Sequence, residues 1–196
     1  MKKQILSIVI LILVSASAAF SQTVEQQATK IRQLYAATNK RIDAGLKDKT
    51  AGFHYAAWTL GGERDGQQWS AVGTMKIQDE FWFDGEPGQD GEESEDARKL
   101  IRKIVSAYAG AADLRTRGEY LFNDAGEMVF AFTSELDPEG KTMERRFYYA
   151  KGKLIRVVRD GKNIDRNVGN EDEQLATNAM TDAKKLQNIF ALMFAE

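Results

Sequence analysis

Residues 113–162 read DLRTRGEYLFNDAGEMVFAFTSELDPEGKTMERRFYYAKGKLIRVVRDGK. Four runs rich in aromatic and β-branched residues alternate here with short polar segments that carry Gly126, Gly140 and Gly152. These glycines lie 14 and 12 residues apart, a spacing typical of strands joined by tight turns. No intervening segment is long enough to hold a crossover helix, so consecutive strands must be antiparallel. The segment predicts a four-stranded antiparallel meander.

The last hairpin of this meander turns at Lys151 and Gly152. A two-residue turn would place Lys151 at positive φ, which a residue with a Cβ atom disfavours. We therefore predict a three-residue turn over residues 150–152 that sets Tyr149 opposite Lys153. In this register the core face of the hairpin carries Phe147, Tyr149, Ile155 and Val157, and the other face carries Arg146, Tyr148, Leu154 and Arg156.

Basic residues crowd the same hairpin, because residues 141–162 contain eight Lys or Arg against two acidic residues. Aromatic and basic side chains together suggest a surface for a polyanion, but half-buried strands also alternate core and charged positions. We favour the plain hairpin. What remains of the first interpretation is a candidate binding patch of Arg146, Tyr148 and Arg156, which we expect on one exposed face.

The segments outside the meander complete an α+β domain. Apolar residues at helical spacing predict an N-terminal helix over 24–46, a central helix over 97–108 and a C-terminal helix over 171–194. Aromatic residues with partial alternation predict strands in 51–60 and 67–84. We expect one antiparallel sheet, the meander plus two or three N-terminal strands, packed by these helices. The central helix should present a solvated basic face with Arg98, Lys99, Arg102 and Lys103.

The first 21 residues have the features of a secretory signal peptide. Lys2 and Lys3 precede a mostly apolar core of ten residues from Ile5 to Val14, and small residues follow. This core is shorter than the roughly 20 apolar residues of a transmembrane helix. The small residues place cleavage between residues 18 and 22, which predicts a periplasmic or secreted single domain over 22–196 without a transmembrane segment.

Composition narrows the classes of partner. The chain has no Cys, so it can form no disulfide and carry no lipid on a thioether. Without Lys2 and Lys3 it has 25 basic against 29 acidic residues, which disfavours a global polyanion binder. Export also argues against nucleic acid as a partner.

The motifs EYLFNDAGEMVFAF and RRFYYAKGKLIRVV cover residues 119–132 and 145–158. With these motifs, and with the order of helix, aromatic strands, helix and meander, the chain resembles uncharacterised exported proteins of Gram-negative bacteria. The resemblance covers the meander and implies an antiparallel fold and a periplasmic location. It implies no activity and no catalytic residue.

Catalytic chemistry has few candidates in this sequence. His54 is the sole histidine and shares one side of its predicted strand with Ala56, Trp58 and Leu60, which predicts partial burial beside aromatic rings. No G-x-S-x-G elbow accompanies it, and zinc sites usually draw on Cys and several His. We favour a structural role for His54 and expect no catalytic, cofactor-binding or metal-binding residue.

Acidic residues offer two further candidates. Nine of them fall between residues 79 and 96, but an EF-hand pattern starting at Asp84 fails because Gln89 stands where Gly is required. We favour a solvated loop over a cation site. Asp79 and Glu80 lie beside Phe81 and suggest a glycosidase pair, yet adjacent strand residues point to opposite faces and cannot flank one bond.

The favoured hypothesis is an exported, non-enzymatic binding protein of the cell envelope, whose partner is a protein, a glycan or an apolar ligand. A second hypothesis is a carrier or sensor of an apolar ligand, with the Met-rich and Phe-rich C-terminal helix as a lid over the sheet. A hydrolase that uses carboxylates is the weakest of the three. None of them requires a cofactor.

Overall fold

The computed structural model describes residues 2–61, 75–85, 97–110, 115–136 and 139–194, with the backbone alone for residues 2–23. In this part of the chain, eight strands form one sheet, and each strand is antiparallel to its neighbours in sequence. Two α-helices accompany it, α1 (Lys2–Lys47) and α2 (Asn170–Met193). The antiparallel sheet and the α+β arrangement agree with expectation, whereas three helices were expected.

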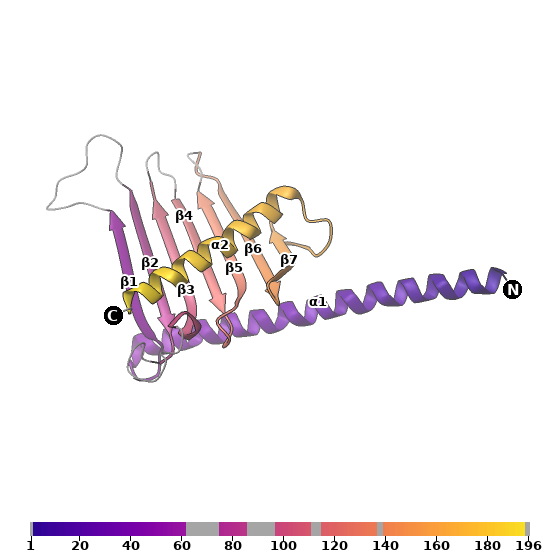
Figure 1. Cartoon of the computed structure of the whole chain (residues 1–196). Coiled ribbons are helices and arrows are strands. Elements are labelled where there is room, and N and C mark those ends of the chain that lie inside the picture. Colours follow the sequence, from indigo (N-terminus) through magenta and orange to yellow (C-terminus); the bar gives the residue numbers. More distant parts are fainter. Residues whose placement is uncertain (1, 62–74, 86–96, 111–114, 137–138, 195–196) are drawn as a thin grey trace.

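The strands follow one another across the sheet in chain order (Figure 1). They are β1 (His54–Gly61), β2 (Lys76–Phe83), β3 (Ile101–Ala109), β4 (Arg115–Phe122), β5 (Met128–Leu136), β6 (Thr142–Ala150), β7 (Lys153–Arg159) and β8 (Lys162–Ile164). The predicted meander corresponds to β4–β7 and is confirmed. The short strand β8 was not predicted, and it pairs with β7 through a turn at Asp160 and Gly161, both at positive φ.

The predicted central helix is wrong. Its residues form a short 3₁₀ helix, η1 (Ala97–Leu100), followed by strand β3. Both faces of β3 are covered: Ile104 packs in the cluster that α2 covers, and Lys103 on the opposite face is 6% exposed. A strand buried on both faces loses strict alternation, and its apolar residues then imitate a helical stripe. The expected solvated basic face therefore does not form at Lys103.

The predicted register of the last hairpin is also wrong. Ala150 pairs with Lys153, so the turn has two residues, Lys151 (φ 51°) and Gly152 (φ 70°). Positive φ at both positions matches the right-handed twist of the flanking strands, which offsets the cost of about 1–2 kcal/mol at a non-glycine residue. The register then shifts between Tyr148 and Tyr149. Pairs that differ from expectation are Tyr149 with Leu154, Tyr148 with Arg156, Phe147 with Val157, and Arg146 with Val158.

One sheet face packs against α2, which crosses the strands in Figure 1. Small residues on α2, Ala176, Ala179 and Ala183, let the helix approach the sheet closely. The Tyr149 hydroxyl donates a hydrogen bond to the Ala176 carbonyl at 2.8 Å. Near the other end of α2, Phe190 is fully buried. Its ring lies 5.4 Å from Phe81, 4.9 Å from Phe83 and 4.9 Å from Phe194.

The opposite sheet face packs against α1 in a second core. Ala28 and Ile31 of the helix meet sheet residues whose side chains point away from α2: Leu121, Phe130, Tyr148 and Val158. Ile155, predicted on the core face with Phe147, packs in this second cluster instead because of the register shift. The sheet is thus the middle layer between two helices.

The predicted helix over 24–46 is confirmed, but α1 begins well before it and runs without a break through the expected cleavage positions. Its N-terminal part extends past β7 and away from the sheet (Figure 1). Removal of the first 21 residues as a signal peptide stays a prediction.

Candidate functional site

The three residues of the predicted patch lie on the sheet face that α1 covers. Tyr148 pairs with Arg156 across β6 and β7, and Arg146 is two residues from Tyr148 on the same side of β6. Tyr148 is 4% exposed and Arg156 is 3% exposed, whereas the Arg146 side chain is 42% exposed. The shared face is as expected, but the expected exposure holds for Arg146 alone because α1 lies over the other two.

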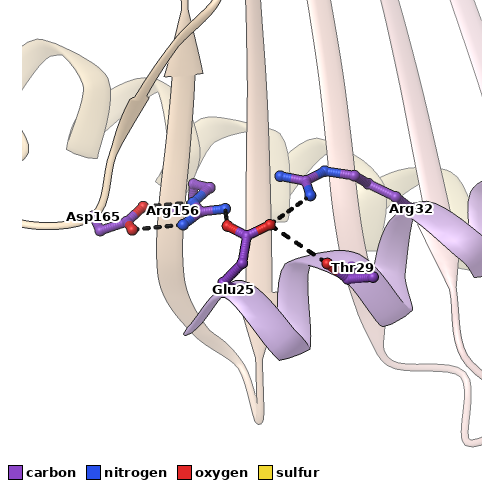
Figure 2. A network of polar contacts seen from close by, with 5 residues as sticks. All are labelled: Glu25, Thr29, Arg32, Arg156 and Asp165. Atoms are coloured by element: carbon purple, nitrogen blue, oxygen red, sulfur yellow. Dashed lines mark hydrogen bonds and ion pairs between the residues drawn. The ribbon is translucent and has the colours of Figure 1, made fainter. Parts of the chain in front are cut away.

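Arg156 lies at the centre of a polar network between α1 and the sheet (Figure 2). Its guanidinium donates to both carboxylate oxygens of Asp165, with 2.6 Å from Nη2 to Oδ2, and its Nη1 donates to Glu25 Oε2 at 2.5 Å. Glu25 Oε1 accepts a further bond from Arg32 Nη1 at 2.9 Å. Hydrogen bonds from Arg156 and then Arg32 lower the pKa of Glu25 to about 2. Arg156 is therefore engaged in holding α1 on β7.

A second polar cluster, Lys103 and Glu119, is buried beneath α1. Lys103 Nζ lies 2.7 Å from Glu119 Oε2, and the Tyr35 hydroxyl donates to the same oxygen at 2.7 Å. Arg117 donates to Glu119 Oε1 at 3.0 Å, and Lys103 also donates to Asn39. Burial would raise the pKa of Glu119, but the hydrogen bonds from Lys103, Tyr35 and Arg117 hold it below its usual value. This cluster was not predicted from the sequence, although Glu119 within a predicted strand was a usable signal.

A cavity of about 370 Å³ opens between α1 and the sheet beside these networks. Its lining residues come from α1, β4, β5 and β6: Ile31, Arg32, Tyr35, Glu119, Phe130, Phe132, Arg146 and Tyr148. Phe130 lies 5.3 Å from Tyr35 and 5.2 Å from Tyr148 between ring centroids, both in edge-to-face geometry. We call this the α1 cavity. Half of its eight lining residues are aromatic.

Two guanidinium groups lie over aromatic rings of the α1 cavity. The Arg146 guanidinium is 5.3 Å from the Phe132 ring centroid, and that of Arg32 is 5.6 Å from the Tyr148 centroid. Arg146 has an exposed ion pair with Glu144 at 3.4 Å, which is longer than a strong charge-assisted hydrogen bond. The arrangement can bind an apolar or aromatic group on the rings and an anionic group on the arginines.

The other sequence candidates lie elsewhere. His54 is exposed, not partly buried as predicted, and it stacks on Phe83 with 5.5 Å between ring centroids. Asp79 and Glu80 point to opposite sheet faces as predicted: Asp79 is buried, and Glu80 accepts a hydrogen bond from Tyr55 at 3.1 Å. Residues 86–96 of the acidic loop lie outside the described residues.

Within the described ranges, no group of three or more His, Asp or Glu side chains could hold a metal ion. Over the same residues, no helix combines the length and the apolar character that a membrane crossing requires.

Comparison with protein-family models, with curated proteins and with solved structures found no match to this chain.

Proposed function

We propose that this chain is an exported, non-enzymatic binding protein whose site is the α1 cavity. The ligand is an organic anion with an apolar or aromatic body. The observation that carries the proposal is that Arg32 of α1 and Arg146 of β6 lie over aromatic rings of one cavity.

The charges around the cavity support an anionic ligand. Glu119, the acidic residue of the lining, already accepts hydrogen bonds from three donors. Arg146 keeps most of its guanidinium donors for a ligand, since its ion pair with Glu144 is long. A carboxylate, sulfonate or phosphate would therefore meet donors on the exposed side of the cavity and rings beneath them.

The volume supports a small molecule. About 370 Å³ falls within the roughly 300–1,000 Å³ of small-molecule sites. A folded protein or a glycan chain would have to contact the cavity through one inserted side chain or sugar. A small organic anion uses both the rings and the arginines.

The test compares two fluorescent probes with nearly the same aromatic body. Anilinonaphthalene sulfonate carries a negative charge, and phenylnaphthylamine carries none. We expect Arg146→Gln to weaken sulfonate binding about tenfold or more, because one charge-assisted hydrogen bond is lost. The same variant should change phenylnaphthylamine binding less than about threefold.

Arg115→Gln is the matched control, because Arg115 is an exposed arginine outside the α1 cavity. It makes the same change of charge and should leave both affinities unaltered. Equal loss of sulfonate binding in the two variants would show a diffuse charge effect, and unchanged binding in Arg146→Gln would refute the site.

A further inference from the structure

A second cavity, on the sheet face opposite the α1 cavity, lies between the strands and α2. It has a volume of about 460 Å³, and Leu186 and Ile189 of α2 line it on the helix side. Trp58, Asp79 and Tyr120 line it on the sheet side. We call it the α2 cavity.

Asp79 is the unusual residue of this cavity. Its side chain is 1% exposed, and its Oδ1 atom has no hydrogen-bond partner among the described residues. A buried acceptor without a partner costs about 1–3 kcal/mol. Stability of the fold therefore does not explain why an Asp occupies position 79.

Asp172 is a buried carboxylate with a structural role, and its two oxygens both have hydrogen-bond partners. Asp172 is also 1% exposed, yet Arg145 donates to its Oδ1 and Arg159 to its Oδ2, each at 3.0 Å. Glu119 on the other face is likewise paired with Lys103. Among the contacts of the described residues, Asp79 has no such basic partner. Its carboxylate is therefore able to bind a cationic group of a ligand.

The neighbours of Asp79 form a row across the sheet. Trp58 of β1 lies directly opposite Asp79, Ser106 of β3 lies on its other side, and Gly118 of β4 continues the row. A Cβ atom at Gly118 would lie 2.6 Å from the Tyr120 hydroxyl oxygen. The missing side chain thus makes room for the Tyr120 hydroxyl next to this row.

We infer that the α2 cavity binds an organic cation, with an ammonium group on the Asp79 carboxylate and an apolar body along Trp58, Leu186 and Ile189. The indole ring of Trp58 adds a cation–π contribution to the recognition of the ammonium group. The cationic side chain on the helix, Lys185, is exposed and paired with Asp182 at 3.1 Å, so it does not neutralise Asp79. This inference does not depend on the anion site in the α1 cavity. It differs from the hypothesis of a purely apolar ligand under the C-terminal helix, because the ligand carries a positive charge.

The electrostatics around Asp79 agree with this ligand. Burial raises the pKa of Asp79, and the Ser106 side chain opposes that rise. Burial, with the charges of Asp182 and Asp79, also raises the pKa of Tyr120, so its hydroxyl stays a donor. An arriving ammonium group would stabilise the ionised form of Asp79, and any proton bound there would pass to the buffer.

The test is calorimetric titration of the full chain with three ligands of similar body: phenylethylammonium, phenylethanol and phenylpropionate. We expect the ammonium to bind about tenfold or more tightly than the alcohol, and the carboxylate to bind weakest. In a parallel fluorescence titration, comparison with a Trp58→Phe variant identifies the part of the fluorescence change that comes from the Trp58 indole. Equal affinity for ammonium and alcohol in the wild-type chain would overturn the inference without any variant.

Asp79→Asn should abolish the preference for ammonium over alcohol. Glu80→Gln is the matched control, because Glu80 is the next residue of β2 and lies on the opposite face. It should retain the preference. A preference that persists in Asp79→Asn would refute the role of Asp79. Arg146→Gln should leave ammonium binding unchanged, which separates this site from the α1 cavity.

Discussion

At the scale of single residues, the main contrast is between paired and unpaired buried charges. Arg156, Glu119 and Asp172 are buried with hydrogen-bonded partners of opposite charge, whereas Asp79 is buried without one. Removing a paired charge and removing an unpaired one should therefore have opposite effects on stability.

Arg156→Gln should lower the free energy of unfolding by about 2–3 kcal/mol. The substitution leaves Asp165 and Glu25 without their shared partner, although both are partly exposed to water. Arg146→Gln is the control and should change stability by less than about 1 kcal/mol, because it loses only an exposed ion pair and a contact with the Phe132 ring. Urea unfolding followed by circular dichroism measures both free energies. Equal effects of the two substitutions would contradict the conclusion that Arg156 holds α1 on β7.

Asp79→Asn should stabilise the protein at neutral pH. Because the pKa of Asp79 is raised by burial, the folded state disfavours its ionised form, and wild-type stability falls as pH rises through that pKa. The titratable and charged groups that line the cavity with Asp79 are Arg117 and Tyr120 of β4, Glu135 of β5, and Asp182 and Lys185 of α2.

The measurement is the difference in unfolding free energy between variant and wild type as a function of pH. The gain should be present at neutral pH, shrink as pH falls through the raised pKa of Asp79, and be gone below the ordinary Asp value of about 3.9. A gain that is the same at all pH values would mean that ionisation of Asp79 does not affect the free energy of unfolding.

At the scale of elements, the sequence predicted the meander because turn glycines separate its aromatic strands at regular intervals. The prediction of a helix at β3 was wrong because both faces of this strand are buried. The spacing of Ile101, Ile104 and Val105 then resembles the apolar stripe of a helix. The prediction of the last turn was wrong because the twist of β6 and β7 outweighs the preference of Lys151 for negative φ.

Lys151→Asn should therefore raise the free energy of unfolding by about 0.5–1 kcal/mol, because Asn tolerates positive φ better and Asn-Gly favours this turn. Lys153→Asn is the control. Lys153 lies in β7, where Asn is a poor strand former, so this change should not stabilise. Thermal or urea unfolding decides between them, and a neutral effect of Lys151→Asn would argue against the two-residue turn.

Phe190→Ala tests the docking of α2. The ring of Phe190 is fully buried among three phenylalanines, so its loss should cost about 3–5 kcal/mol. Leu192→Ala removes an exposed side chain two residues away and should cost less than about 0.5 kcal/mol. Similar losses in the two variants would mean that the C-terminal turns of α2 are not packed as described.

At the scale of the whole molecule, the candidate site could be predicted only in part. The sequence placed Arg146, Tyr148 and Arg156 on one face, since strand alternation is local. It could not reveal that α1 covers this face, because the contact joins Glu25 to Arg156 across 131 positions of the chain. Both cavities exist because two helices cover opposite faces of the sheet, which no local pattern specifies.

The predicted export is also tested on the whole molecule. Production of the full chain in a Gram-negative host should yield a periplasmic form shortened by the residues before the cleavage position, between residues 18 and 22. Intact-mass measurement of the periplasmic and total fractions tests this. Ile10→Asp should keep its full mass, since it would interrupt the apolar core of the predicted signal peptide. Full-length chain in the periplasmic fraction would contradict the prediction.

The strand order has a consequence for how the chain folds. Because each strand pairs with its neighbour in sequence, the sheet can grow hairpin by hairpin with small loop-closure entropy. The helix α1 is an exception, since Arg156 of β7 must be in place before it can donate its hydrogen bond to Glu25. The first helix to be synthesised can thus complete its contact with the sheet only after β7 has formed, and the sheet face of the α1 cavity stays open until then.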